Sequence, residues 1–98
     1  MPVKIDPEKL FKFVKTIEEK LLTTSARKTQ FSVKVLEDDL VFTPISSGKP
    51  RKEVSRNIVK VIERFNDSKS IQPKDYQDIT FNSVYLVTLI EMYLKVNA

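Results

Sequence analysis

The residues with the clearest chemical pattern are basic side chains that recur every four positions between residues 52 and 64. On an α-helix, positions four apart are neighbours, so this spacing predicts a ridge about 18 Å long at 1.5 Å per residue. Like charges at this spacing cost roughly a few tenths of a kcal/mol per pair, so local stability does not explain them. Binding to a polyanion such as a nucleic-acid backbone would explain this arrangement of basic residues. This basic ridge consists of Lys52, Arg56, Lys60 and Arg64.

Further basic residues crowd the expected start of the same helix, where the macrodipole is positive and acidic residues would be stabilising. Lys49 and Arg51 lie there, preceded by Ser46, Ser47 and Gly48. This segment predicts a binding site for one phosphate, because it combines backbone N–H groups, hydroxyls, a permissive glycine and cations at a helix start. The first glycine of a P-loop is missing, so the segment does not predict nucleotide binding.

The same charges also fit an ordinary solvated helix face. Helix surfaces are often rich in Lys and Arg, and Glu53 and Glu63 could pair with Arg56 and Lys60. The phosphate-binding and solvated-face interpretations both stay open on the sequence alone.

The composition argues against several kinds of chemistry. Cysteine and histidine are absent, which excludes disulfides, thiolate nucleophiles, the commonest general base and the commonest metal ligand. The acidic residues at 37–39 could bind a divalent cation weakly, but a solvated hairpin turn explains them as well. Glu18 and Lys20 have a nuclease-like spacing with nothing to complete a site. We therefore expect no enzyme activity, no metal and no cofactor.

The hydropathy and charge of the chain predict its cellular location and the charge of its partners. No apolar run approaches the roughly 18–20 residues that span a bilayer, and the first residues lack the apolar run of a signal peptide. We expect a cytoplasmic protein with no membrane contact. Its net charge is +4, from 17 Lys and Arg against 13 Asp and Glu, which mildly favours anionic partners.

The periodicity of apolar residues predicts an α+β fold for one domain spanning residues 1–98. Three main helices pack around one antiparallel β-hairpin in the order α-β-β-α-α. Helix-start residues at 6–8 open the first helix, and alternating apolar residues mark the hairpin. The expected elements are a helix from 6 to about 22, strands at 31–35 and 40–45, a helix at 51–64, a short turn at 72–77 and a helix from about 80 to 96.

The last helix is apolar on nearly every side, so it is either central to the core or shared with a partner. The central position accounts for most of this pattern, and a homodimer through residues 81–96 is the second expectation. Residues 71–85 also have the outline of a helix-turn-helix, with Asn82 and Ser83 placed to touch base edges. Capping of the helix explains the polar residues there more simply.

Aromatic residues offer a second way to contact nucleic acid. Phe31 and Phe42 on the hairpin could stack on unpaired bases, although alternating strand positions favour the core. Tyr76, in a polar segment, is the better candidate for an exposed ring. Arg27 and Lys28, in the loop before the hairpin, could extend a basic surface.

Taken together, the sequence predicts a small basic domain that binds DNA or RNA without catalysis, mainly through phosphate contacts. The alternative is a protein-interaction module in which the apolar C-terminal helix or an open hairpin edge makes the contact. In that case the basic ridge meets an acidic partner. The residues expected to contact phosphate are Ser47, Gly48, Lys49, Arg51, Lys52, Arg56, Lys60 and Arg64.

Overall fold

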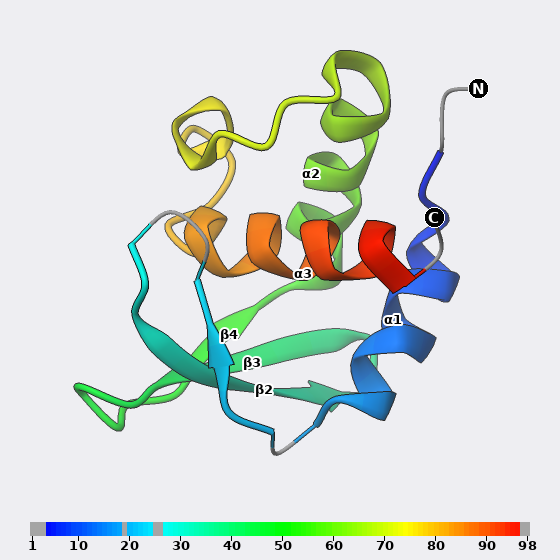
Figure 1. The fold of residues 1–98 in the computed structure, drawn as a ribbon. Helices are drawn as coiled ribbons and strands as arrows, with labels where there is room; N and C mark the ends of the chain where they lie inside the picture. Colours follow the sequence, from blue (N-terminus) through cyan, green and yellow to red (C-terminus); the bar gives the residue numbers. More distant parts are fainter. Residues whose placement is uncertain (1–3, 19, 25–26, 97–98) are drawn as a thin grey trace.

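The structure, a computed structural model, describes residues 4–18, 20–24 and 27–96. It confirms the α+β class, with three α-helices and an antiparallel sheet (Figure 1). The expected hairpin is the centre of a four-stranded sheet, so the strand count differs from the expectation. The elements are α1 (Pro7–Thr16), β1 (Leu22–Thr23), β2 (Gln30–Leu36), β3 (Asp39–Pro44), β4 (Arg51–Glu53), α2 (Ser55–Ser68), the 3₁₀ turn η1 (Pro73–Tyr76) and α3 (Ser83–Val96).

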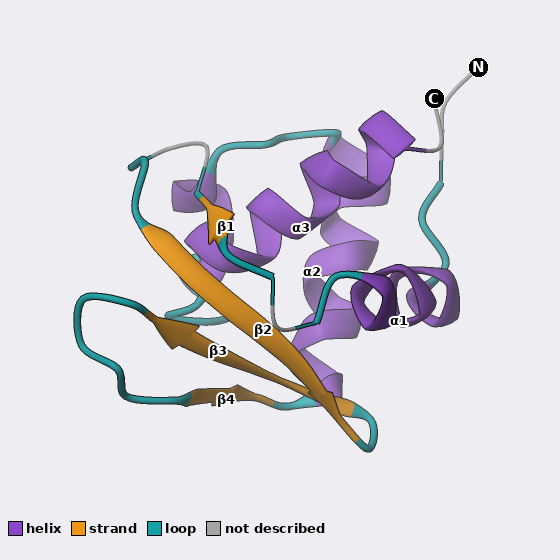
Figure 2. Ribbon diagram, turned by 60° about the horizontal axis from the view of Figure 1, so that its bottom comes forward, coloured by secondary structure: helices purple, strands orange, loops and turns teal. Residues whose placement is uncertain are grey.

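The sheet is an antiparallel meander in the order β1-β2-β3-β4. Its register places Val33 opposite Phe42, so the alternating apolar residues of β2 and β3 lie on one face. That face packs against α3, where the ring of Tyr85 lies 5.3 Å from that of Phe42 and 4.9 Å from that of Phe31. Figure 2 shows the helices on this one side of the sheet. Phe31 and Phe42 are therefore core residues.

The helix expected at 51–64 begins later, at Ser55, and its first residues form strand β4 instead. β4 pairs with β3, with Glu53 opposite Leu40. A strand of three residues is too short to show a periodicity, and pairing with the open edge of β3 decides its conformation. The predicted start is therefore wrong by four residues, and the helix continues to Ser68, beyond the expected end at 64.

The N-terminus of α2 is stabilised by a residue distant in sequence. Val54 occupies the capping position without a side-chain hydrogen bond, and the Ser55 N–H donates to Asp39 Oδ1 at 2.8 Å. Asp39 thereby supplies the negative charge that the helix start lacks in its own first turn.

We expect Asp39→Ala to lower the free energy of unfolding by about 1 kcal/mol, because helix caps contribute roughly 0.5–2 kcal/mol. The partly exposed contact of Asp39 with Lys52 adds little to this. Urea denaturation monitored by circular dichroism measures the loss. Asp67→Ala removes an equal charge from the exposed far end of α2 and is the matched control. Equal effects of the two substitutions would contradict the capping role.

The first helix also ends earlier than its apolar spacing predicts. Asp6 caps α1 as expected, accepting from the Glu8 N–H at 2.9 Å, but the helix stops at Thr16 rather than near Leu22. Ile17 and Leu22 are still buried, and Leu22 pairs with Phe31 as part of β1. The apolar residues after Thr16 are therefore apolar because they are buried in the core, and they do not continue the helix.

The apolar C-terminal helix α3 lies at the centre of this chain's own core, as its composition predicts. It buries Leu86, Val87, Leu89 and Ile90 between the sheet and the other helices (Figure 1). A homodimer through this helix stays a prediction. In the described part of the chain, no helix is long and apolar enough to cross a membrane.

Candidate functional site

The predicted basic ridge does not form one surface. Arg51 and Lys52 belong to β4, where successive side chains point to opposite faces of the sheet. The Lys52 Nζ lies 3.4 Å from Asp39 Oδ2. Only Arg56, Lys60 and Arg64 of the ridge belong to α2.

The predicted geometry of the phosphate-binding site is wrong for the same reason. The loop at 45–50 connects β3 to β4, and the three residues of β4 separate it from α2 by about 10 Å. Ser47 Oγ accepts from the Lys49 N–H at 3.3 Å, and the Gly48 N–H donates to Pro44 O at 2.8 Å. Gly48 has φ +66°, a conformation that glycine adopts without strain. These residues shape a hairpin loop and do not converge on a helix start.

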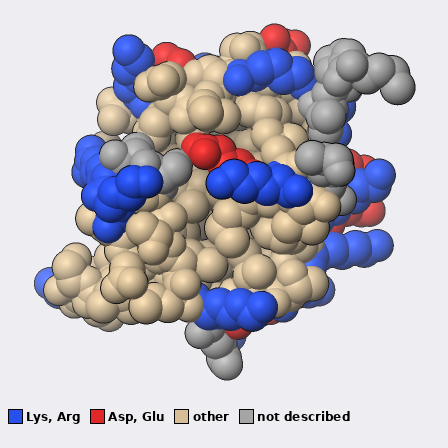
Figure 3. Space-filling model, in the orientation of Figure 1, with Lys and Arg blue, Asp and Glu red and all other residues tan. Residues whose placement is uncertain are grey.

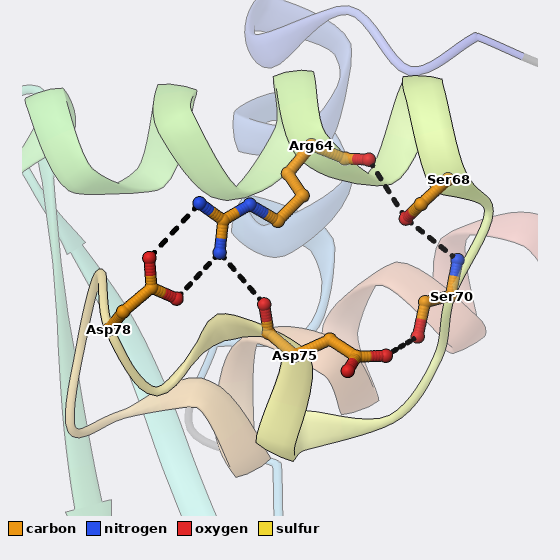
Figure 4. A network of polar contacts seen from close by, with 5 residues as sticks. All are labelled: Arg64, Ser68, Ser70, Asp75 and Asp78. Carbon is orange, nitrogen blue, oxygen red and sulfur yellow. Dashed lines mark hydrogen bonds and ion pairs between the residues drawn. The ribbon is translucent and has the colours of Figure 1, made fainter.

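Arg64 of α2 forms hydrogen bonds with the segment that joins α2 to α3 (Figure 4). Its Nη1 donates to Asp78 Oδ1 at 2.5 Å and to Asp75 O at 2.8 Å, and its Nη2 donates to Asp78 Oδ2 at 3.0 Å. The hydrogen bond from Arg64 holds the pKa of the Asp78 carboxyl below its ordinary value of 3.8. The pKa of Arg64 is correspondingly raised, chiefly by the hydrogen bond to Asp78. Arg64 is therefore already neutralised within the chain.

Tyr76 lies under the same segment and is fully buried, so the expectation of an exposed ring is wrong. Its hydroxyl donates to Ser70 O at 2.6 Å, while the Ser70 hydroxyl donates to Asp75. Burial raises the pKa of the Tyr76 hydroxyl. The polar neighbours of Tyr76 face water and the ring fills the core, an orientation that a short polar segment does not reveal.

Arg56 and Lys60 lie on the exposed side of α2. Within the described ranges, neither has an ion-pair partner. The surroundings of Lys60 carry both signs of charge, because Glu63 and Asp67 line the shallow hollow that includes it. This surface is less favourable to a polyanion than a surface without acidic residues.

The helix-turn-helix interpretation fails because Asn82 and Ser83 are buried. The Asn82 amide donates to Glu53 Oε1 at 3.3 Å, the Asn57 amide donates to Glu53 Oε2 at 3.1 Å, and the Thr80 hydroxyl donates to Glu53. Glu53 is 3% exposed. We call Glu53 and these donors the Glu53 network. Its hydrogen bonds connect the residues just before α3 to β4, and its polar groups do not face a groove of DNA.

Basic residues also lie at the end of the sheet opposite the β2–β3 turn: Arg27 and Arg51 line one pocket, Lys28 lines a neighbouring one, and Lys49 lies in the loop at 45–50. Residues 27–29, the loop at 45–50 and the start of β4 lie at the same end of the sheet, because Thr23 pairs with Gln30, Phe31 with Pro44 and Phe42 with Arg51. The stretches of sequence that contain these residues, 20–36 and 40–52, hold no Asp or Glu. Figure 3 shows basic side chains along the left side of the molecule. We call Arg27, Lys28, Lys49 and Arg51 the basic end.

A pocket of about 380 Å³ lies between the basic end and the start of α3. Arg27 and Arg51 line it from the sheet side, while Gln77, Phe81 and Tyr85 line it from the helix side. Among the residues described, neither arginine has an acidic partner. The side chain of Phe81 is 95% exposed.

Phe81 is the feature of this pocket that the sequence analysis missed. The sequence pattern places Phe81 at the start of the apolar C-terminal helix, whereas in the structure it precedes that helix and stands between polar residues. Those polar neighbours, Thr80 and Asn82, were the available indication that this ring lies outside the core.

Comparisons with models of protein families, with curated proteins and with solved structures found no match. Within the described residues, no three acidic side chains are grouped as metal ligands, and Asp39 of the acidic turn is engaged with α2. The case for a function therefore rests on the basic end and its pocket.

Proposed function

We propose that this chain is a non-catalytic nucleic-acid-binding protein whose basic end contacts backbone phosphates. The observation that carries the proposal is that Arg27 and Arg51, from two stretches far apart in the sequence, line one pocket together, with no acidic side chain in its lining among the described residues. Arginine and lysine bind phosphate oxygens directly and release counterions from the nucleic acid. A cytoplasmic location, expected from the sequence, is part of this proposal.

Of the eight residues predicted to contact phosphate, the proposal retains Lys49 and Arg51 as charged contacts. Ser47 and Gly48 keep a supporting role, because they shape the loop that presents Lys49. Lys52 and Arg64 already face Asp39 and Asp78, so a phosphate would have to displace an internal carboxylate. Arg56 and Lys60 lie on the exposed side of α2, and the hollow that includes Lys60 also contains acidic residues.

The alternative is that the basic end binds an acidic segment of another protein. The exposed apolar side chains of Ile45 and Phe81 nearby suit such a contact. Nucleic acid remains the better proposal, because its phosphates are closely spaced along the backbone. The cations of the basic end have no ion-pair partner among the described residues, so several of them are available to bind neighbouring phosphates.

Fluorescence anisotropy with labelled single-stranded DNA, single-stranded RNA and duplex DNA tests the proposal. We expect micromolar or tighter binding at low salt. Four phosphate contacts predict a slope of log K against log salt of about −3 for a single strand, at roughly −0.7 per phosphate. Absence of binding to all three probes at low salt would refute the proposed function.

A further inference from the structure

The exposure of Phe81 is imposed by its neighbours and does not reflect a loose segment. Thr80 and Asn82, on either side of it, are both buried and both donate hydrogen bonds to Glu53. The Asn82 N–H also donates to Thr80 Oγ1 at 3.0 Å. With the backbone fastened on both sides, the Phe81 ring is held outward in water, where it adds nothing to the stability of the core.

The ring shares its pocket with two arginines that come from other parts of the fold. Arg51 comes from β4 and Arg27 from the connection between β1 and β2, while Phe81 precedes α3. Tyr85 forms part of the pocket wall and is fixed there by its contacts with Phe31 and Phe42. The pocket thus combines a flat apolar ring, a rigid aromatic wall and two guanidinium groups that have no acidic partner among the described residues.

We propose that this pocket binds one unpaired base of a single-stranded nucleic acid, with the base stacked on Phe81. Arg27 and Arg51 contact the phosphates on either side of that base. The inference rests on the proposed function and specifies its substrate as single-stranded DNA or RNA. Base–aromatic stacking tolerates any base, because every base has a π face.

The geometry favours an unpaired base over a duplex. In a duplex, each base face is covered by the neighbouring pairs, so an exposed ring finds no face to stack on. A volume of about 380 Å³ is at the small end for ligand pockets and suits one nucleotide. Gln77 and Ser46 at its lining offer donors and acceptors to the edge of the base.

The test compares three labelled strands of equal length, about twelve nucleotides: oligothymidylate, oligouridylate and an abasic DNA strand. The abasic strand keeps every phosphate and lacks every base. The native chain should bind the base-containing strands about 5- to 150-fold more tightly than the abasic strand, the range expected for one stacked base.

Variants of the chain assign this preference to Phe81. Phe81→Ala should remove the preference for bases and leave affinity for the abasic strand unchanged. Leu36→Ala removes an exposed apolar side chain next to the acidic β2–β3 turn and should leave all affinities unchanged. Phe81→Trp introduces the only tryptophan of the chain, whose fluorescence should be quenched by oligothymidylate and not by the abasic strand.

The outcomes separate this inference from the proposed function. Equal affinity for abasic and base-containing strands, with no quenching of Phe81→Trp, overturns the stacking inference while phosphate binding stands. Failure to bind any strand overturns both. Quenching of Phe81→Trp by polyglutamate, without binding to the strands, would assign the pocket to an acidic protein segment and also overturn both.

Discussion

Replacing Glu53 with alanine is expected to lower the free energy of unfolding by about 3–5 kcal/mol. The carboxylate is buried and accepts hydrogen bonds from Asn57, Thr80 and Asn82. Each donor left buried without an acceptor costs roughly 1–3 kcal/mol, and the missing side chain leaves a cavity. Small domains have roughly 5–15 kcal/mol of stability in total, so this one residue decides a large part of it.

Urea denaturation measures this loss, with two variants for comparison. Glu53→Gln keeps the shape and one acceptor oxygen, so its loss should be clearly smaller than that of Glu53→Ala. Glu63→Ala removes an exposed carboxylate from α2 and should change stability by less than about 0.5 kcal/mol. A loss below about 1 kcal/mol for Glu53→Ala would show that the Glu53 network does not hold β4 to the approach to α3.

The parts of the fold that the sequence predicts are those with a long or strict pattern. Alternation over β2 and β3 identifies the hairpin, because each strand buries one face. The apolar composition of α3 places it centrally, because no exposed position on a small domain would tolerate it. The cap at Asp6 also follows from local residue types.

Strand β4 and the cap on α2 could not be predicted in this way. Whether residues 51–53 form a strand or a helical turn depends on the free edge of β3, and the cap comes from Asp39, sixteen positions before Ser55. Both are tertiary contacts that no local pattern contains. As a result, Lys52 was predicted on a helix ridge, whereas in the structure it lies on the outer face of the sheet.

The candidate site was predicted only in part because charge spacing says nothing about partners. Lys52 and Arg64 were correctly identified as basic and regularly spaced, yet each faces a carboxylate from elsewhere in the chain. Arg27 and Arg51 are distant in sequence and become neighbours of one pocket only through the order of the strands. The exposure of Phe81 depends on Glu53, which is likewise brought to it by the fold.

The charge-reversal pair Arg27→Glu/Arg51→Glu is expected to weaken binding of single-stranded DNA by at least about 30-fold at low salt. Two phosphate contacts are lost and two repulsions replace them, so the salt slope should become shallower by about 1.4. Both side chains line an open pocket at the surface and have no acidic partner among the described residues, so the fold should be retained. Circular dichroism and the unfolding midpoint check this directly.

The matched control is Arg56→Glu/Lys60→Glu on the exposed side of α2. Each double variant changes four units of charge and takes the net charge from +4 to zero, so a difference between them reports position and not total charge. Anisotropy of one labelled strand with the native chain and both variants is the most direct test of the basic end. The account predicts at least about 30-fold weakening for Arg27→Glu/Arg51→Glu and less than about 3-fold for the control. Equal weakening by the two variants, or undiminished binding by Arg27→Glu/Arg51→Glu, would contradict it.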